Sequence, residues 1–345
     1  MNNIIQNRSE LLFIYDVRDA NPNGDIEENK PRIDVESGIN IVTDVRLKRT
    51  IRDYLLNHRQ QEIFVREIEY APGKIQDAKL RAEDFLLDDS GQKITKSDFQ
   101  NRFRSNEKKD QEIFQEMKMV IDSNIKKHCI DVRLFGVTLP VEFDQKNKGS
   151  ITYTGPVQFK IGRSLHRVGE PKLIRGTGAF ASKQDYGQKT FREEYILPYS
   201  LICFYGIINE NAAKDTGLTD DDVELLIDGM WNGTKNLITR SKVGQMPRLL
   251  LHVIYKERNY HIGDLDKKIK IITLNNKNEE EIRGISDFKL DLTELAKVLF
   301  TNKNKIEKVR FLVDDDLQIV KDNDEIKIDN LVEEIVFEKI QLQLY

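Results

Sequence analysis

The sequence contains only two cysteines, Cys129 and Cys203, and they lie far apart in the chain. Their separation indicates neither a disulfide framework nor a zinc site built from cysteines. The five histidines have no metal-ligand spacing, and neither a Gly-x-Ser-x-Gly nor a His-Glu-x-x-His motif occurs. No metal and no cofactor is therefore expected. Because no run of about 18 apolar residues occurs, no membrane span is expected either.

The charge balance also restricts the interpretation. The 345 residues carry a formal net charge of −4, so any nucleic-acid site must be a local basic patch. Hydrophobic residues make up 39% of the chain, which is enough for the core of one elaborated domain or of two smaller domains. The segment MNNIIQNRSE lacks the basic and apolar regions of a secretory signal, so a reduced, cytoplasmic location is expected.

The most informative segment is residues 11–56. Residues 11–17 are apolar on both faces, with Asp16 as the exception, which is typical of a strand in the middle of a sheet with both faces covered. The turn sequence NPNG follows at 21–24. Thr43 and Asp44 can then cap a helix whose apolar residues recur every four positions up to residue 55. The segment therefore predicts a buried strand, a turn-rich loop and a helix.

Four cationic residues lie on this predicted helix: Arg46, Lys48, Arg49 and Arg52. Lys48 and Arg52 are one turn apart and share a face. A solvated helix face, with Arg49 paired to Asp53, is the more common explanation of such a pattern. The alternative is a row of phosphate ligands, because cations and free N–H groups at a helix start attract a polyanion. The helix alone does not decide between them.

Residues 160–192 differ in composition from the rest of the chain. They contain eight Lys and Arg residues against two acidic ones, together with five glycines. We predict an extended, exposed and basic excursion, and its length indicates a function because long structureless loops are uncommon. The sequence GTGAF lacks the Lys-Ser/Thr of a phosphate-binding loop, so nucleotide hydrolysis is not supported. The candidate ligands here are Arg163, His166, Arg167, Lys172, Arg175 and Lys183.

The remaining segments alternate between strand-like and helix-like patterns. Their order is compatible with an elaborated ferredoxin-like β-α-β-β-α-β sheet, hence with an α+β fold. A polar, charged insertion precedes residue 130. The predicted strands are 63–70, 130–139, 155–159, 195–208 and 248–255, and the predicted helices are 110–127 and 219–237.

Carboxylates follow the first strand, and such a group could bind a divalent ion: Asp16, Asp19, Asp25 and Asp34. Turn formation and charge pairing with arginine are the commoner roles of aspartate, and we favour them here. The aromatic residues in CFYG at 203–206 fit a sheet core better than a base-stacking platform. No motif indicates an enzyme.

Five motifs in consistent order point to a known family. They are YDVRDANPNGD, TDVRLKRTIRDYL, DVRLFG, GPVQF and SKVGQMPRLLL, and they span most of residues 8–256. In them the chain resembles the backbone subunit of type I CRISPR Cascade complexes, most closely the I-B-like branch, within the RAMP superfamily. The first two motifs together are specific, whereas the tail from residue 257 matches less distinctly.

The resemblance implies a modified ferredoxin-like (RRM-like) palm with a helical insertion and a protruding thumb loop. Several copies would polymerise along one CRISPR RNA, and each thumb would fold over the guide. The implied parts are a palm at 8–70 and 130–256, a helical insertion at 71–129, a thumb at 160–192 within the palm, and C-terminal strands and a helix at 257–345 that complete the palm.

The resemblance also implies a function without catalysis. The implied partners are CRISPR RNA, the target DNA strand, further copies of the chain in a helical filament, and other Cascade subunits. A guide-binding subunit must accept any guide sequence, so it should hold phosphates and leave base edges free. Besides Arg46 and the basic excursion, the implied RNA-binding residues are Asn21, Asn23, Thr43, Lys48, Arg49, Arg52, Ser241, Lys242, Gly244 and Gln245.

One rival function remains open at this point. Related backbone subunits of type III complexes cleave RNA with an aspartate in the loop after the first strand. Asp25 or Asp34 occupies that region here. A metal-dependent ribonuclease is therefore the alternative hypothesis.

Overall fold

A computed structural model describes residues 3–88, 90–104, 110–181 and 189–342. The chain divides into two compact units, and the boundaries pass through helices α1 (Asp44–Arg59) and α7 (Asp220–Lys235). Among the described residues, no helix has the length and apolar character that a membrane crossing requires. Unit 1 comprises Met1–Gln6, Leu55–Gln158 and Asn209–Leu226; unit 2 comprises Asn7–Tyr54, Phe159–Ile208 and Ile227–Tyr345.

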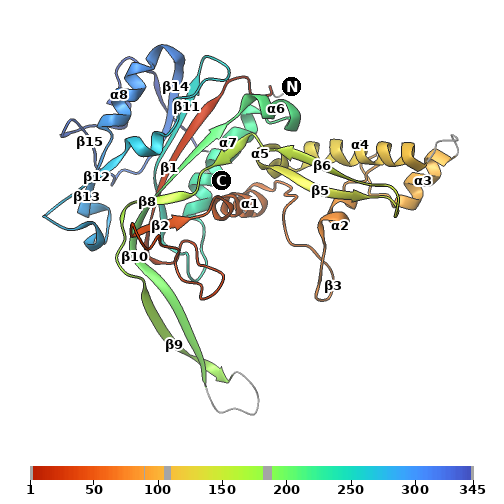
Figure 1. Cartoon of the computed structure of the whole chain (residues 1–345), viewed down its shortest axis with the longest axis horizontal. Coiled ribbons are helices and arrows are strands. Elements are labelled where there is room, and N and C mark those ends of the chain that lie inside the picture. Colours follow the sequence, from red (N-terminus) through yellow and green to blue (C-terminus); the bar gives the residue numbers. More distant parts are fainter. Residues whose placement is uncertain (1–2, 89, 105–109, 182–188, 343–345) are drawn as a thin grey trace. The chain divides into compact units, whose positions relative to one another are not determined.

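Unit 2 is built on a large, mainly antiparallel sheet with β1 at its centre (Figure 1). Strand β1 pairs with β10 on one side and with β11 on the other, and its residues 9–17 are all buried. The prediction of a central, doubly covered first strand is therefore confirmed. In spatial order the strands are β17 (Phe337–Lys339), β14 (Ile306–Val313), β11 (Gln245–Tyr255), β1 (Ser9–Ala20), β10 (Lys189–Ile208), β8 (Gly162–Arg167) and β2 (Ile39–Val42).

The basic excursion is a strand followed by a β-hairpin arm rather than a structureless loop. Strand β8 lies within the large sheet, and β9 (Lys172–Ala181) pairs antiparallel with the first part of β10. The pair β9–β10 forms an arm that extends beyond the sheet (Figure 1). Residues 173–176 of β9 lie opposite residues 192–195 of β10 in the antiparallel register. Lys183 lies outside the described residues.

The C-terminal part of unit 2 adds a second, smaller sheet. Helix α8 (Thr293–Thr301) follows β13, and its residues Leu295 and Leu299 are buried in the same hydrophobic core as β11 and β14. The smaller sheet contains β12 (Lys270–Thr273), β13 (Phe288–Asp291), β15 (Ile319–Lys321) and β16 (Asp324–Glu325). Short 3-10 helices lie at Leu265–Lys268, Glu279–Glu281, Ile285–Asp287, Lys303–Lys305 and Ile328–Asn330.

Unit 1 has a hydrophobic core of its own. The apolar side of α4 contributes Ile113, Met117 and Ile121, which cluster with Leu139 and Ile151 of a β-hairpin. The helix predicted at 110–127 is thus confirmed. The elements of this unit are α2 (Ala78–Glu83), α3 (Lys96–Arg104), α4 (Asp110–His128), α5 (Ile130–Phe135), α6 (Glu210–Thr216), β3 (Glu69–Ala71), β4 (Lys74–Ile75), β5 (Gly136–Glu142) and β6 (Lys148–Thr154). Strand β7 (Val157–Phe159) pairs with β10 of the large sheet.

The strand predicted at 130–139 is wrong in its first half, which forms helix α5. The buried Asp131 carboxylate accepts hydrogen bonds from the backbone N–H of Phe64 at 2.7 Å and of Val65 at 3.1 Å. Gly136 ends the helix at a φ of 74°, where a Cβ would lie 2.2 Å from the Tyr153 carbonyl oxygen. A short apolar run fits a strand and a helix equally well, so periodicity could not separate them.

Candidate nucleic-acid interface

Three segments of unit 2 meet where β1 ends. The Asn21 N–H donates to the Ser241 carbonyl at 2.8 Å, and the Lys242 ammonium donates to the Asn21 carbonyl at 3.0 Å. The Asn23 side-chain oxygen accepts from the N–H of Thr43 at 2.9 Å and from its hydroxyl at 3.0 Å. The loop after β1, the start of α1 and the loop before β11 therefore adjoin. We call this site the β1 corner: Asn21, Asn23, Thr43, Arg46, Ser241, Lys242, Gly244 and Gln245.

Helix α1 begins at the corner as the sequence predicts. The Thr43 hydroxyl accepts a hydrogen bond from the Arg46 N–H at 3.2 Å and so caps the helix. Leu47 and Ile51 are buried and fix which side of the helix faces the core. The positive end of the helix dipole and its first N–H groups therefore lie beside the corner residues.

Two of the cations predicted to contact RNA are engaged in ion pairs along α1. Lys48 lies 3.0 Å from Asp44, and Arg49 lies 2.7 Å from Asp53. The Arg49–Asp53 pair is exposed, and a pair of this kind contributes only a few tenths of a kcal/mol, so a phosphate could displace Asp53 at small cost. The Lys48 side chain is only 12% exposed in its pair. Neither cation by itself requires a bound anion. Arg52 is half-buried on the same helix.

Arg46 and Lys242 differ from these paired cations. Burial lowers the pKa of the Arg46 guanidinium. Burial, followed by repulsion from Arg46, lowers the pKa of Lys242 to about 8. Arg46 donates to the Thr50 hydroxyl at 2.9 Å, yet among the described residues neither cation forms an ion pair with a carboxylate. The corner thus holds two neighbouring, partly desolvated positive charges, of which only Arg46 is attracted by a carboxylate, that of Asp53, without an ion pair. An anion would stabilise this arrangement.

Unsatisfied polar atoms gather at the same place. The Asn21 side-chain oxygen, the Arg46 Nε and the Gln245 side-chain nitrogen are buried without a hydrogen-bond partner. Such atoms are rare in folded proteins and each costs about 1–3 kcal/mol. Their concentration at the corner indicates a site that is complete only when a ligand or a local rearrangement supplies the missing partners.

Arg32 is a further cation beside the corner that the sequence interpretation missed. Its backbone N–H donates to the Asn23 carbonyl at 3.3 Å, and its Nε is buried without a partner. Among the described residues it forms no ion pair with a carboxylate. Arg32 follows Pro31 between two acid-rich turns, so in the sequence it resembles an ordinary charge partner.

His166, predicted to contact RNA, is buried and serves the sheet instead. Its ring lies between β8 and β10, where one nitrogen accepts from the Leu201 N–H at 3.2 Å and the other lies 2.8 Å from the Arg167 carbonyl. Burial lowers the pKa of its imidazole. A neutral ring held by two backbone groups cannot reach a phosphate, so His166 is withdrawn from the candidate ligands.

The other predicted cations of the basic segment are exposed. Arg163 lies 3.8 Å from Asp34, and Arg175 on β9 lies 2.8 Å from Glu193 on β10. Arg167 and Lys172 are also exposed. At the corner itself, Asn21 and Gln245 are buried, whereas Gly244 is exposed at a φ of 88° that favours glycine.

Asp25 and Asp34, the aspartates of the ribonuclease alternative, organise the loop in which they lie. The Asp25 carboxylate accepts from the Glu28 N–H at 2.8 Å, and this bond lowers its pKa. Hydrogen bonds from the Ser37 side chain and from the Glu36 N–H, the latter at 3.2 Å, lower the pKa of Asp34. Within the described part of the chain, no three His, Cys, Asp or Glu side chains are grouped to hold a metal ion.

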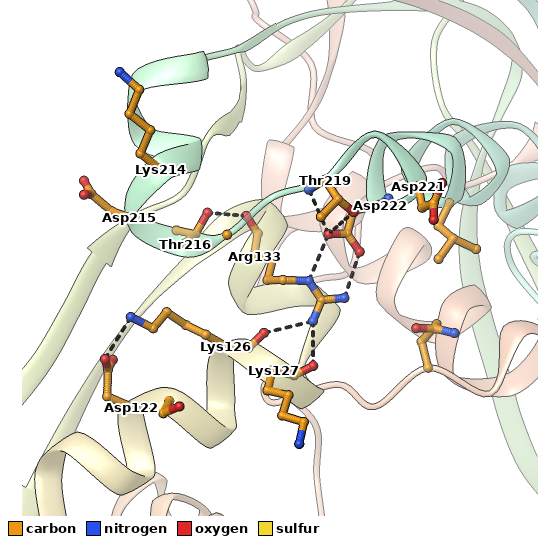
Figure 2. A pocket seen from close by; sticks show the side chains of 14 residues that line it. Asp122, Lys126, Lys127, Arg133, Lys214, Asp215, Thr216, Thr219, Asp221 and Asp222 are labelled. Carbon is orange, nitrogen blue, oxygen red and sulfur yellow. Dashed lines mark hydrogen bonds and ion pairs between the residues drawn. The ribbon is translucent and has the colours of Figure 1, made fainter. Parts of the chain in front are cut away.

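A separate pocket of about 710 Å³ lies within unit 1 (Figure 2). Arg133 lines the pocket, and its guanidinium donates two hydrogen bonds to the Asp222 carboxylate, at 2.7 and 2.9 Å. Lys126 pairs with Asp122 at 2.9 Å. These central charges are neutralised by one another, and no residue predicted to bind RNA lines the pocket. It is therefore a polar cleft with internally paired charges rather than a polyanion site.

The fold and the site together define a class of protein. A mixed α+β fold with one large sheet, whose central strand ends at a cationic corner, is suited to holding a polyanion. The family model described as "CRISPR-associated protein Cas7" matches residues 7–293, and the chain belongs to this family. The resemblance that the sequence motifs indicated is therefore confirmed.

A relative supports this assignment, and a solved structure has a similar fold. The "CRISPR-associated protein Cas7" of Haloferax volcanii (strain DS2) is 32% identical over 340 residues, covering 94% of this chain and 92% of the relative. A chain of a structure titled "CRISPR RNA-guided surveillance complex, pre-nicking" matches with a TM-score of 0.52 at 12% identity, covering 97% of this chain and 96% of that one. At that identity the structural match supports the fold alone.

Proposed function

We propose that this protein coats CRISPR RNA as the backbone subunit of a type I Cascade complex. The observation that carries the proposal is the pair Arg46 and Lys242, two adjacent and partly buried cations without a carboxylate partner in the described structure. The phosphodiester backbone of RNA supplies the missing negative charge. It also supplies acceptors for the unsatisfied donors of the corner.

Binding the RNA through its sugar-phosphate backbone suits a subunit that must accept every guide sequence. Phe204 and Tyr205, the aromatic residues on β10 that could have stacked on bases, are buried. A base-reading sheet surface is therefore not available at these rings. RNA held by its phosphates and riboses would keep its base edges free to pair with a target DNA strand, as guide RNA must.

The finer architecture is part of the same proposal. The large sheet would be the modified ferredoxin-like palm, with 71–129 as a helical insertion, the β9–β10 arm as the thumb within 160–192, and 257–345 completing the palm. Successive copies would follow one RNA together with other Cascade subunits. Further contacts with the RNA backbone are proposed for cations on α1 and for exposed cations of the basic segment: Lys48, Arg49, Arg52, Arg163, Arg167, Lys172 and Arg175.

The proposed role is structural rather than catalytic. Asp25 and Asp34 accept hydrogen bonds from their own loop, so their oxygens serve to shape that loop. A metal-dependent ribonuclease would require these oxygens to converge on an ion with further ligands. We therefore favour guide binding over RNA cleavage.

The direct test is to isolate the protein from its native host under mild conditions and to sequence the RNA that remains bound. We expect nuclease-protected RNA whose ends derive from CRISPR repeats and whose internal sequences vary. A protein that elutes as an RNA-free monomer from that host would contradict the proposal. Incubation of the isolated complex with complementary RNA and Mg²⁺ provides the second readout, and no cleavage is expected.

The pKa of Lys242 predicts a pH dependence of RNA binding. With a pKa of about 8 in the free protein, Lys242 is mostly charged at pH 7 and mostly neutral at pH 9. RNA binds the charged form, so affinity should fall as pH rises through 8, by up to about tenfold for the loss of one phosphate contact. Fluorescence anisotropy with a labelled RNA at pH 7 and pH 9 measures this change.

The Lys242→Arg variant is the matched control for this pH effect. Arginine stays charged throughout this range, so the variant should bind equally at both pH values. An equal loss of affinity at pH 9 in the native protein and in the arginine variant would assign the pH effect to another group.

A further inference from the structure

Two exposed valines lie beside the cation pair of the β1 corner. Val45 precedes Arg46 in the first turn of α1 and is 66% exposed. Val243 follows Lys242 in the loop before β11 and is 54% exposed. A single exposed apolar residue is ordinary on a protein surface. Two of them next to the same cation pair give the corner an apolar part that phosphate binding does not explain.

The stability of the fold does not account for these valines either. At their exposures, neither side chain gains much from burial. The core-facing side of α1 is formed by Leu47 and Ile51, which are buried. A β-branched residue also loses rotamer freedom in a helix, so Val45 is a less favourable choice for α1 than a straight-chain residue. The two valines therefore serve a contact outside the folded chain.

The backbone at both positions is already held by hydrogen bonds. The Thr43 hydroxyl caps the turn of α1 that contains Val45, by accepting from the Arg46 N–H at 3.2 Å. The Val243 N–H donates to the Thr239 carbonyl at 3.0 Å and so closes a turn. A ligand that contacts the two side chains does not need to order the backbone first, which lowers the entropic cost of binding.

The ligand of this surface must combine negative charge with apolar faces. Arg46 and Lys242 attract an anion, and the acidic residue in the first turn of α1, Asp44, is paired with Lys48 at 3.0 Å. Inorganic polyphosphate offers charge alone. A single-stranded nucleic acid offers both properties, because each phosphate is joined through a ribose to a base with two stacking faces. The adjacency of the valines to the cations therefore favours a nucleic acid over an inorganic polyanion.

We propose that Val45 and Val243 contact the faces of the nucleobases whose phosphates the corner holds, and so make the site selective for nucleic acid over other polyanions. The inference deepens the proposed function, because it rests on Arg46 and Lys242 binding phosphates of the guide. Contact with a base face tolerates any sequence, since every base has such a face, and it leaves the base edges free to pair. The valines thus add affinity for every guide without reading it.

A comparison of RNA with a matched abasic chain tests the base contact. The two probes are a short oligouridylate and a ribose-phosphate oligomer of equal length without bases, and fluorescence anisotropy gives both affinities. Val45→Ser/Val243→Ser should bind the oligouridylate about 10- to 25-fold more weakly, at about three- to fivefold for each valine. Its affinity for the abasic chain should stay within about twofold of the native value. The slope of log affinity against log salt should not change, because no phosphate contact is removed.

Two further variants serve as controls. Val45→Ile/Val243→Ile keeps the apolar surface and should bind the oligouridylate at least as tightly as the native protein does. Val336→Ser removes a valine of similar exposure, 65%, that lies outside the corner, and it should leave both affinities within about twofold.

The outcomes separate this inference from the proposed function. If the serine variant lost equal affinity for both probes, or lost none for either, the base contact would be overturned while the cation pair remained the RNA site. A native protein that bound neither probe would instead overturn the proposed function.

Discussion

Replacing Arg46 with glutamine and Lys242 with methionine in one variant should weaken RNA binding by about 100-fold or more. Each cation is expected to make a charge-assisted hydrogen bond to a phosphate, and such bonds contribute about 1.5–3 kcal/mol each. The loss should be similar for RNAs of different sequence, because phosphates carry no sequence information. The slope of log affinity against log salt should decrease by about 1.4, at about 0.7 for each phosphate contact on a single strand. Filter binding across a salt series measures both effects.

The same substitutions should not destabilise the protein, which separates a binding defect from a folding defect. Arg46 and Lys242 repel one another, and burial disfavours their charged forms. Removing the charges relieves this repulsion and burial cost but also removes the donors to the Asn21 carbonyl and the Thr50 hydroxyl. The two effects oppose one another, so the midpoint of thermal unfolding should change little.

The control for this variant is Lys267→Ala/Lys297→Ala. It removes two exposed lysines that are paired with Asp264 and Glu294, and it should leave RNA affinity within about twofold. If the Arg46/Lys242 variant kept native affinity, or lost it for some sequences only, the corner would not be the phosphate site.

The corner shows which part of a binding site a sequence can predict. Turn and helix-start chemistry predicted a turn at 21–24 and a helix start at 43, but the binding role of these segments and of 241–245 was implied only by the family resemblance. Their convergence depends on long-range pairing of β1 with β11, in which Val17 lies opposite Gln245. No local pattern contains that information. The pairing also explains why Arg46 and Lys242, almost 200 residues apart, become one charged pair.

The sequence-based prediction was wrong for His166 and missed Arg32. Residues 160–192 were predicted as an exposed excursion, whereas β8 within this segment is a strand of the large sheet and His166 is buried there. Arg32 was not considered as a ligand, and its sequence neighbours Asp25 and Asp34, which could have neutralised it, bond to their own turn backbones instead. The spacing of Arg49 and Asp53 had indicated their ion pair, which the structure contains, and Lys48 lies beside Asp44 in the same way, so the contact of both cations with RNA stays a prediction. For His166 and Arg32 the deciding fact is a side-chain environment that periodicity does not fix.

Replacing Glu10 with alanine should lower the free energy of unfolding by about 3–5 kcal/mol. Glu10 is fully buried on β1, and its carboxylate accepts from the hydroxyls of Tyr205 and Tyr255. It also accepts from the N–H of Ile262 at 2.9 Å and of Gly263 at 2.8 Å. Alanine would leave these four donors without their acceptor and would open a cavity in the sheet. Urea denaturation followed by circular dichroism measures the change.

The position of Glu10 makes this prediction independent of the RNA site. Glu10 lies near the start of β1 and the corner follows its end, which places them about 30 Å apart along the strand. The variant should therefore bind RNA with native affinity at temperatures where it remains folded, in contrast to the Arg46/Lys242 variant. Glu294→Ala, at an exposed and ion-paired position, should change the unfolding free energy by less than about 0.5 kcal/mol. A Glu10→Ala variant as stable as this control would show that the four donors find other acceptors, and that the carboxylate does not hold the loop before Asp264 against the sheet.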